Sequence, residues 1–316
     1  MTQLARPVEP FGEVNVFRET DGRLRVVATV LMEPDIEGAK AGLALDASAS
    51  MKKIYGANAP VSPLFAKAAG VTNIVEPVAR TMASYLARFA SSGRVTLAYW
   101  ACDSDGSKVE PIGEFNDDQT QTIDIRGPRK FPWGRNTRLL PPVKYFIEQV
   151  FVNCPWAIGV FVTDGEIADL AEVKAYSLDF AKAIAKGDRS FVKLVLLGVG
   201  EEVRQSQLAE LDDMFDGSDL RDPKGEPIDL WDHKLVSEMK SLTEIFAEVI
   251  SEHVILAESG QVLDHRHQVV HHYTDGVPGR LEFFLPGDAT EFTLKLPHLA
   301  IVQDLTEGLS QIGTGD

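Results

Sequence analysis

Near-continuous apolar runs alternate with amphipathic stretches through the middle of the chain. Four runs have the length of a strand, and they cover residues 42–45, 95–101, 157–162 and 192–199. Runs without polar alternation are typical of strands covered on both faces. The stretches between them place apolar residues three and four positions apart, as helices do, over 74–90, 143–152, 168–186 and 242–253. The pattern predicts an α/β domain over residues 40–253, with a doubly wound, mostly parallel sheet.

Both flanks of this domain have the pattern of β-structure. Apolar runs at 14–17 and 24–31 surround Asp21-Gly22, a pair typical of hairpin turns. Short strand-like runs return between residues 254 and 296, separated by Pro-Gly and Asp-Gly pairs. Neither flank has enough strands for a core of its own. We therefore expect residues 12–34 and 254–305 to form one flanking antiparallel sheet or small sandwich, and the tail from residue 308 to be frayed.

A pattern of oxygen donors directly follows the first buried run. Asp46, Ser48 and Ser50 place one carboxylate and two hydroxyls two residues apart. Mg²⁺ and other hard cations prefer oxygen ligands and retain some water. Asp and Ser at a strand end are also common turn formers and helix caps. This stretch alone does not decide between a metal site and a cap.

Two later stretches favour the metal. Asp164 comes directly after the run at 157–162, and Thr137 lies on a polar turn before a helical pattern. Ligands of open α/β sheets collect beyond the carboxyl ends of the strands. Asp46 and Asp164 lie at two such ends, and the loop that carries Thr137 can reach the same rim.

These five residues, in this order, resemble the metal-ion-dependent adhesion site (MIDAS) of von Willebrand factor A (vWA) domains, whose fold is Rossmann-like. The resemblance covers about residues 40–253. Within that family the chain is most similar to tellurium-resistance proteins of the TerF/TerY type, on the basis of residues 50–55, 208–214 and 228–232. The Ala-, Pro- and Gly-rich stretch 56–72 departs from the pattern as an insertion, and whether it covers the rim is open.

The resemblance implies a function as well as a fold. Five residues would surround one Mg²⁺ ion, or alternatively Mn²⁺ or Ca²⁺: Asp46, Ser48, Ser50, Thr137 and Asp164. A protein partner would supply an Asp or Glu to complete the metal's shell. The implied role is in bacterial tellurite or metal-stress resistance.

Net charge, cysteine content and the lengths of the apolar runs indicate which partners and which cellular compartment to expect. The 316 residues carry a formal net charge of −16, which disfavours nucleic acid and anionic membrane surfaces and favours cations and basic partner surfaces. Cys102 and Cys154 adjoin buried runs and are expected to be reduced thiols. The first residues lack the apolar core of a secretory signal, and no apolar run is long enough to span a membrane. We therefore expect a cytoplasmic protein.

Other patterns leave alternatives open. Four histidines (His265, His267, His271 and His272) could form a transition-metal site or the polar face of a strand. Residues 103–107 resemble the start of a calcium loop but favour a simple turn. The chain has no Gly-Lys-Ser/Thr phosphate loop and no Gly-x-Ser-x-Gly motif. We predict a binding module rather than an enzyme, without catalytic residues. The alternatives are a metal-dependent hydrolase or phosphatase at the same rim, and a scaffold with a vestigial site.

Overall fold

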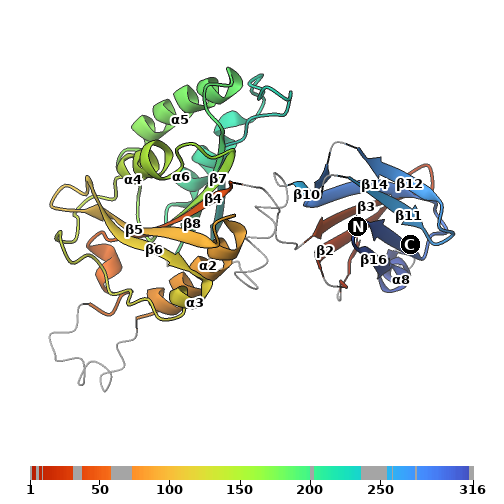
Figure 1. The fold of residues 1–316 in the computed structure, drawn as a ribbon, viewed down its shortest axis with the longest axis horizontal. Coiled ribbons are helices and arrows are strands. Elements are labelled where there is room, and N and C mark those ends of the chain that lie inside the picture. The colour runs from red at the N-terminus through yellow and green to blue at the C-terminus, as the bar shows by residue number, and fades with distance from the viewer. Residues whose placement is uncertain are drawn as a thin grey trace. The chain divides into compact units, whose positions relative to one another are not determined.

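The computed structural model divides the chain into two compact units (Figure 1). It describes residues 2–4, 7–8, 10–30, 38–57, 73–199, 203–235, 255–257, 259–274 and 276–312. Unit 1 comprises Met1–Ile36 and Thr243–Asp316, and unit 2 comprises Glu37–Leu242. The expected helix at 242–253 and most of the expected insertion (58–72) lie outside the described residues.

Unit 2 is built on a six-stranded mixed sheet. The strand order is β6 (Lys108–Asn116), β5 (Arg94–Cys102), β4 (Lys40–Asp46), β7 (Trp156–Thr163), β8 (Phe191–Gly198) and β9 (Trp231–Leu235). Every neighbouring pair is parallel except β5 and β6, which are antiparallel. All eight residues of β7 are buried, as expected for a central strand covered on both faces.

Helices cover this sheet on two sides. Figure 1 shows α4 (Leu140–Tyr145) and α5 (Leu170–Ala185) on one side, and α2 (Val75–Phe89) and α3 (Asp117–Thr120) on the other. A five-residue π-helical turn continues α4, and α6 (Gln205–Asp212) precedes β9. A glycine permits the close packing of one face, because a Cβ at Gly42 would lie 2.2 Å from the Phe146 ring.

The edge strand β9 is anchored by a buried lysine of β8. Lys193 Nζ lies 2.9 Å from Asp229 Oδ2 and 3.2 Å from the Trp231 carbonyl oxygen. Only 2% of the Lys193 side chain is exposed, and a buried ammonium group is tolerated only with such partners. The pair thus joins β8 to the residues that lead into β9.

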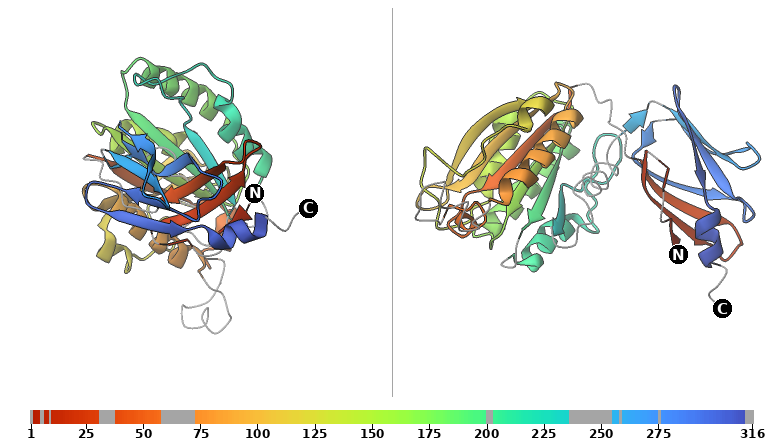
Figure 2. Two further views of the ribbon diagram at one scale, coloured as in Figure 1. Left: turned by 90° about the vertical axis from the view of Figure 1, so that its right-hand side faces the viewer. Right: turned by 90° about the horizontal axis from the view of Figure 1, so that it is seen from below.

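Unit 1 contains two four-stranded antiparallel sheets (Figure 2). One has the order β1 (Thr2–Gln3), β2 (Phe11–Arg18), β3 (Leu24–Val30) and β14 (Arg280–Leu285). The other has the order β12 (Val269–Tyr273), β11 (Gly260–Asp264), β15 (Glu291–Lys295) and β16 (Ala300–Asp304). A two-stranded ribbon of β10 (Ile255–Ala257) and β13 (Val277–Pro278) accompanies them.

The two large sheets of unit 1 share one core. The Phe292 ring of β15 lies 5.3 Å from the Phe11 ring and 5.0 Å from the Phe283 ring, both of the other sheet. Strand β3, near the start of the chain, pairs along six residues with β14, near its end. The N- and C-terminal flanks therefore build one β-structure together.

The predicted fold class, an α/β protein with a doubly wound, mostly parallel vWA/Rossmann-like sheet, is wrong for the chain. Among the described residues, strands account for 38% and helices for 25%, and three antiparallel sheets accompany the mixed one. Strands β6, β9 and β16 had no clear apolar run. Edge strand β6 contains Pro111 and Gly113, and β9 contains Asp232, His233 and Lys234. The protein is mostly β.

The tail differs from the prediction as well. Residues Thr306–Ile312 form helix α8, where a frayed end was expected from residue 308. Leu305, directly before it, is fully buried, and the Leu309 amide donates to its carbonyl. No helix in the described ranges is long and apolar enough to cross a membrane.

Candidate metal centre

The carboxyl ends of the parallel strands form one rim of the unit 2 sheet, and a buried aspartate lies at this rim. Asp46 ends β4 and Thr163 ends β7, and the two strands are parallel neighbours, so their ends lie side by side. Asp46 Oδ2 accepts a hydrogen bond from the Thr163 hydroxyl at 2.6 Å, and Oδ1 accepts one from the Ser48 amide at 2.6 Å. The pKa of Asp46 is raised to about 7: burial is the main cause, nearby Asp164 adds to the rise, and these hydrogen bonds oppose it.

A line of hydroxyls continues from this carboxylate toward solvent. The Oγ atoms of Ser48 and Ser50 lie 3.0 Å apart, and the Ser50 hydroxyl donates to Asp164 Oδ1 at 2.8 Å. Ser48 and Asp164 are buried, whereas Ser50 is exposed. The first motif and the residue after β7 therefore meet directly.

Thr137 reaches the same space above Gly165. A Cβ built on Gly165 would lie 3.1 Å from Thr137 Oγ1 and 3.9 Å from Ser50 Oγ. The two hydroxyls therefore converge on the backbone that follows Asp164. All five residues of the expected site lie at this rim, on three segments far apart in the sequence.

Backbone pairing holds the Thr137 loop against the first motif. The Gly134 amide donates to the carbonyls of Ala47 and Ala101, both at 3.1 Å, and the Ala49 amide donates to the Gly134 carbonyl at 2.7 Å. A Cβ at Gly134 would lie 2.1 Å from the Ala101 carbonyl oxygen, so no larger residue fits there. On the other side, the Ala168 amide donates to the Thr137 carbonyl at 2.9 Å.

A buried glutamate of β6 shapes the start of this loop. Glu110 Oε1 accepts the Arg129 amide at 2.9 Å, and Oε2 accepts the amides of Lys130 and Phe131 at 2.8 and 3.1 Å. Glu110 is 5% exposed. One carboxylate thus satisfies three consecutive donors, which fixes the loop. The sequence does not indicate this role of Glu110, because a charged residue in a half-polar strand carries no sign of burial.

A second unpredicted carboxylate fixes the far end of the loop. Asp169 accepts the amides of Leu139 and Leu140 at 2.7 and 3.1 Å, at the start of α4. Arg138 lies 3.6 Å from it. Burial raises the pKa of Asp169, and these amides oppose the rise. Its place at the start of the helical pattern 168–186 indicates a cap of α5. Its side chain makes no cap hydrogen bond to that helix and bonds the start of α4 instead.

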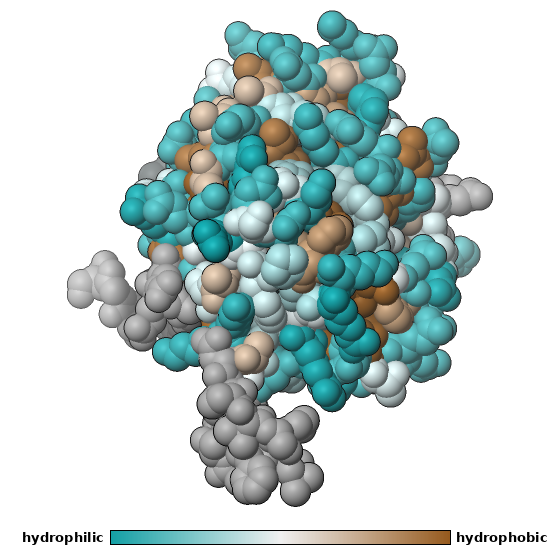
Figure 3. Space-filling view, turned by 90° about the vertical axis from the view of Figure 1, so that its left-hand side faces the viewer, coloured by the Kyte–Doolittle hydropathy of each residue, from teal (hydrophilic) through white to brown (hydrophobic). Residues whose placement is uncertain are grey.

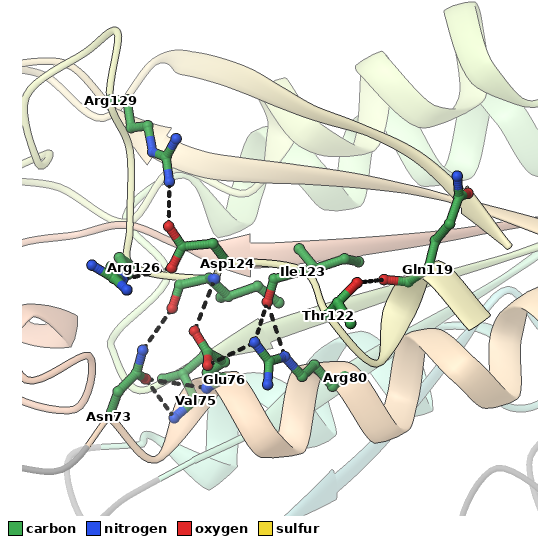
Figure 4. Close-up of polar contacts among 11 residues, drawn as sticks. Asn73, Val75, Glu76, Arg80, Gln119, Thr122, Ile123, Asp124, Arg126 and Arg129 are labelled. Atoms are coloured by element: carbon green, nitrogen blue, oxygen red, sulfur yellow. Dashed lines mark hydrogen bonds and ion pairs between the residues drawn. The ribbon is translucent and has the colours of Figure 1, made fainter. Parts of the chain in front are cut away.

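Helix α2 anchors the segment that leads into the loop (Figure 4). Asn73 caps the helix by accepting the amides of Val75 and Glu76, both at 3.1 Å, and donates to the Ile125 carbonyl at 2.6 Å. The Glu76 carboxylate accepts the Ile125 amide at 3.1 Å. Arg80 donates twice to the Ile123 carbonyl, at 2.9 and 2.6 Å. The chain therefore enters the loop from a fixed point.

Helix α6 holds the segment that follows Asp164. Gln207 Oε1 accepts the Ile167 amide at 2.9 Å, and Gln207 Nε2 donates to the Ile167 carbonyl at 3.1 Å. The Gln207 side-chain amide thus pairs with both the N–H and the C=O of Ile167, as a neighbouring β-strand would. The residues between Asp164 and Asp169 are thereby tied to α6 as well as to Thr137.

One buried donor near the rim has no partner among the described residues. The Tyr55 hydroxyl is buried, and its ring packs edge-to-face on the rings of Tyr99 and Trp133. Burial raises the pKa of Tyr55 well above its usual value, and the nearby Tyr99, Asp46 and Asp164 add to the rise. Tyr55 thus lies within electrostatic reach of both site carboxylates.

The chemistry of the donor set fits a hard cation. The rim offers only carboxylate and hydroxyl oxygens, the ligands that Mg²⁺, Mn²⁺ and Ca²⁺ take. Within the described ranges, no group of three or more His, Cys, Asp or Glu side chains could hold a metal. The rim is not such a group, because three of its five donors are the hydroxyls of Ser and Thr. Such a donor set carries little negative charge, which leaves a bound cation electrophilic.

The other candidate sites of the sequence have local roles in the structure. His271 of β12 packs its ring 4.5 Å from the Tyr273 ring. The Nδ1 atom of His265 is buried without a hydrogen-bond partner among the described residues. Residues 103–107 form a turn, in which the Gly106 amide donates to the Asp103 carbonyl at 3.0 Å.

Comparisons with known proteins identify no family. No family model and no curated protein matches the chain. Among solved structures, the chain is similar to the pilus adhesin SpaC from Lactobacillus rhamnosus GG in its open conformation, at 12% identity and a TM-score of 0.36. The similarity covers 92% of this chain, which spans 46% of the adhesin chain. A similarity at this level supports no inference about fold or function.

Proposed function

We propose that the rim of unit 2 binds a divalent cation and, through it, a carboxylate of a protein partner. Ser48, Ser50 and Thr137 supply hydroxyl oxygens, and Asp46 and Asp164 bind directly or through water. The cation is Mg²⁺, with Mn²⁺ and Ca²⁺ as alternatives. When bound, it offers a coordination position on its solvent side to an Asp or Glu side chain of the partner.

The observation that carries this proposal is the convergence of three segments on one space. Ser50 Oγ contacts Asp164 Oδ1 at 2.8 Å, and the hydroxyls of Ser50 and Thr137 both flank Gly165. Turn formation or helix capping requires none of these contacts between distant segments. The carboxylate Asp46 lies beneath them and is fixed by Thr163 and Ser48. Arrangements of preset oxygens lower the cost of ordering ligands around an ion.

Calorimetric titration of Mg²⁺ and Mn²⁺ tests the metal. We expect saturable heats for the wild-type chain and their loss in the variants Asp46→Ala and Thr137→Val. Asp118→Ala is a matched control, because Asp118 is exposed on α3, away from the rim. Circular dichroism checks that each variant folds. Equal weak heats in wild type and Asp46→Ala contradict the proposal.

Chelation separates the binding module from its alternatives. A partner captured through the cation dissociates in EDTA, whereas contacts of a scaffold with a vestigial site survive. A hydrolase or phosphatase at the same rim would turn over phosphate esters in Mg²⁺ and stop in EDTA. No specific observation favours either alternative, and we propose that the protein is not an enzyme.

The cellular role we propose is resistance to tellurite or related metal stress in a bacterial cytoplasm. Its support is the sequence resemblance, together with two buried, unpaired cysteines, Cys102 and Cys154, which suit a reducing compartment. Growth of a deletion strain on tellurite tests it. We expect rescue by the wild-type gene and not by Thr137→Val, and equal growth of all strains would contradict the role.

A further inference from the structure

The loop that carries Thr137 is basic within an acidic chain. Residues 126–138, which we call the basic loop, contain no Asp or Glu, although the chain has a formal net charge of −16. Its five cationic side chains are Arg126, Arg129, Lys130, Arg135 and Arg138. The positive charge of this segment repels a cation bound nearby, so the segment does not help to hold the cation. It attracts an anionic ligand that binds to the cation.

Two of these five cations are unpaired. Arg126 and Arg129 both form ion pairs with Asp124, at 2.5 and 2.6 Å, and Arg138 lies 3.6 Å from Asp169. Lys130 and Arg135 are exposed and have no ion-pair partner among the described residues. Arg135 is two residues from Thr137. These two side chains are therefore the ones available to an incoming ligand.

Within the basic loop, no large hydrophobic side chain is exposed. Figure 3 shows the end of unit 2 that lies on the left in Figure 1, and hydrophilic or pale residues cover most of it, with scattered hydrophobic ones. A partner that binds there gains little from apolar burial. Charge complementarity and metal coordination must supply the specificity instead.

Three consecutive backbone amides of the basic loop, and those of the two residues after it, already have hydrogen-bond partners. The amides of Arg129, Lys130 and Phe131 donate to Glu110, and those of Leu139 and Leu140 donate to Asp169. Phosphate sites commonly use such consecutive backbone amides as a cradle. Here the amides are occupied, and only separate side-chain cations point outward. Spaced cations suit the spaced carboxylates of an extended acidic peptide better than one compact phosphate.

The loop is also preorganised. Gly127, Gly134 and Thr137 each have backbone groups bonded to other elements, at 3.1, 3.1 and 2.9 Å. A ligand therefore does not have to order the backbone that presents Lys130 and Arg135, which reduces the entropy cost of binding.

We propose that the partner segment recognised at the rim is an acidic stretch of protein. One of its carboxylates coordinates the cation, and neighbouring Asp or Glu side chains pair with Lys130 and Arg135. This inference rests on the proposed function and specifies its partner. The net negative charge of the whole chain repels such a partner at long range, so recognition depends on contacts at the loop.

Fluorescence anisotropy with labelled synthetic peptides tests the inference. One twelve-residue Gly/Ser peptide carries a single Glu, and a second carries four. In saturating Mg²⁺ we expect the second to bind roughly tenfold more tightly, because its additional carboxylates can pair with the two exposed cations. The double variant Lys130→Gln/Arg135→Gln should lose that gain and keep the calorimetric Mg²⁺ affinity.

A control for the removal of positive charge lies at the other end of the sheet. Lys224 is exposed, and its neighbour Pro223 lies beside Gly187, in the turn that precedes β8. Lys224→Gln removes a positive charge without touching the rim. We expect it to leave the affinity for both peptides unchanged, which separates a local contact from a change in net charge.

Each outcome decides one of the two proposals. Equal affinity for both peptides in Mg²⁺, or binding of neither, overturns the acidic partner while measured Mg²⁺ binding preserves the proposed function. If the protein does not bind Mg²⁺, the proposed function is refuted. The pairing of acidic side chains with Lys130 and Arg135 would still be supported if the four-Glu peptide binds in EDTA and the double variant abolishes this binding. Stronger competition by inorganic phosphate or an oligothymidylate than by the unlabelled four-Glu peptide identifies a phosphate site and overturns the inference.

Discussion

The Thr163 hydroxyl donates a 2.6 Å hydrogen bond to Oδ2 of Asp46, which joins the last residues of two adjacent parallel strands. Both residues are fully buried. Within the described part of the chain, the main groups that favour the ionised carboxylate are neutral donors, namely the Thr163 hydroxyl and the amide and side chain of Ser48. The charge of Asp46 is therefore poorly compensated within the protein, and this has measurable consequences.

Stability without metal should fall as pH rises toward neutrality. The pKa of Asp46 is raised from its usual 3.8 to about 7, so between these values the folded protein binds more protons than the unfolded chain. The resulting stability is fully present below pH 3.8 and is lost as pH passes 7. Relative to Asp46→Asn, which does not titrate, the wild type should lose on the order of 3 kcal/mol between pH 5 and pH 8.

Urea denaturation in EDTA at several pH values measures this difference. Asn keeps the shape of Asp but presents an amide group to one of the two donors, which adds an offset that does not depend on pH. Only the slope is therefore diagnostic, and parallel curves would refute the raised pKa. Mg²⁺ should flatten the slope, because it binds the ionised carboxylate and releases its proton.

Thr163→Val should destabilise the protein around Asp46, although Thr163 is not one of the five expected metal ligands. Valine has the shape of threonine but removes the donor to Asp46 and the acceptor of the Gly165 amide, a 3.2 Å contact. We expect a loss of roughly 1.5–3 kcal/mol in unfolding free energy at pH 8, where Asp46 is ionised, and a smaller loss at pH 5. Denaturation at both values measures it, and Thr163→Ser, which keeps the hydroxyl, should restore most of the loss.

Gly165→Ala should impair metal binding more than folding. The added methyl group would lie 3.1 Å from Thr137 Oγ1, so this hydroxyl must move by a few tenths of an ångström. The backbone of Gly165 does not require a positive φ, so folding should cost about 1 kcal/mol or less. We expect Mg²⁺ affinity to fall roughly tenfold in calorimetry. An Mg²⁺ affinity equal to that of the wild type would contradict this role of Gly165.

Glu110→Gln should loosen the basic loop. Glutamine replaces one acceptor oxygen with an amide nitrogen, so one or two of the three buried backbone donors lose their partner. We expect a loss of about 2–4 kcal/mol in unfolding free energy and faster hydrogen exchange at the amides of residues 129–131. Glu114→Gln on the same strand is the control, because its pair with Arg94 is exposed and its change should cost under about 0.5 kcal/mol. Equal losses in both variants would contradict this role of Glu110.

Long apolar runs in the sequence predicted the central strands of unit 2 to within two residues. The run at 157–162 lies inside β7 (Trp156–Thr163), and the run at 95–101 lies inside β5 (Arg94–Cys102). Edge strands could not be predicted in this way, because one side of an edge strand faces solvent and its residues are mixed. Pro111 in β6 and Lys234 in β9 are tolerated for that reason. These strands and the sheets of unit 1 change the class of the fold.

The expected donors share a rim because chemistry and position coincide in the sequence, as with Asp46 and Asp164 at strand ends. The residues that fix those donors have no such signal. Thr163 is an ordinary residue for the end of a strand, and Glu110 is an ordinary residue for a solvent-exposed position, although both are buried. Buried polar residues of this kind are recognised only through partners that lie far away in the sequence, such as the amides of residues 129–131.

The pairing of β3 with β14 sets an order of events during translation. The β2–β3 hairpin leaves the ribosome early, but its partner strand is not complete until Leu285 has been added. At about 5–20 residues per second, the hairpin waits on the order of tens of seconds with one edge unpaired. All of unit 2 is synthesised within that interval. Nascent chains of this protein should therefore need protection of the β2–β3 hairpin, for example by a chaperone, until β14 has been synthesised.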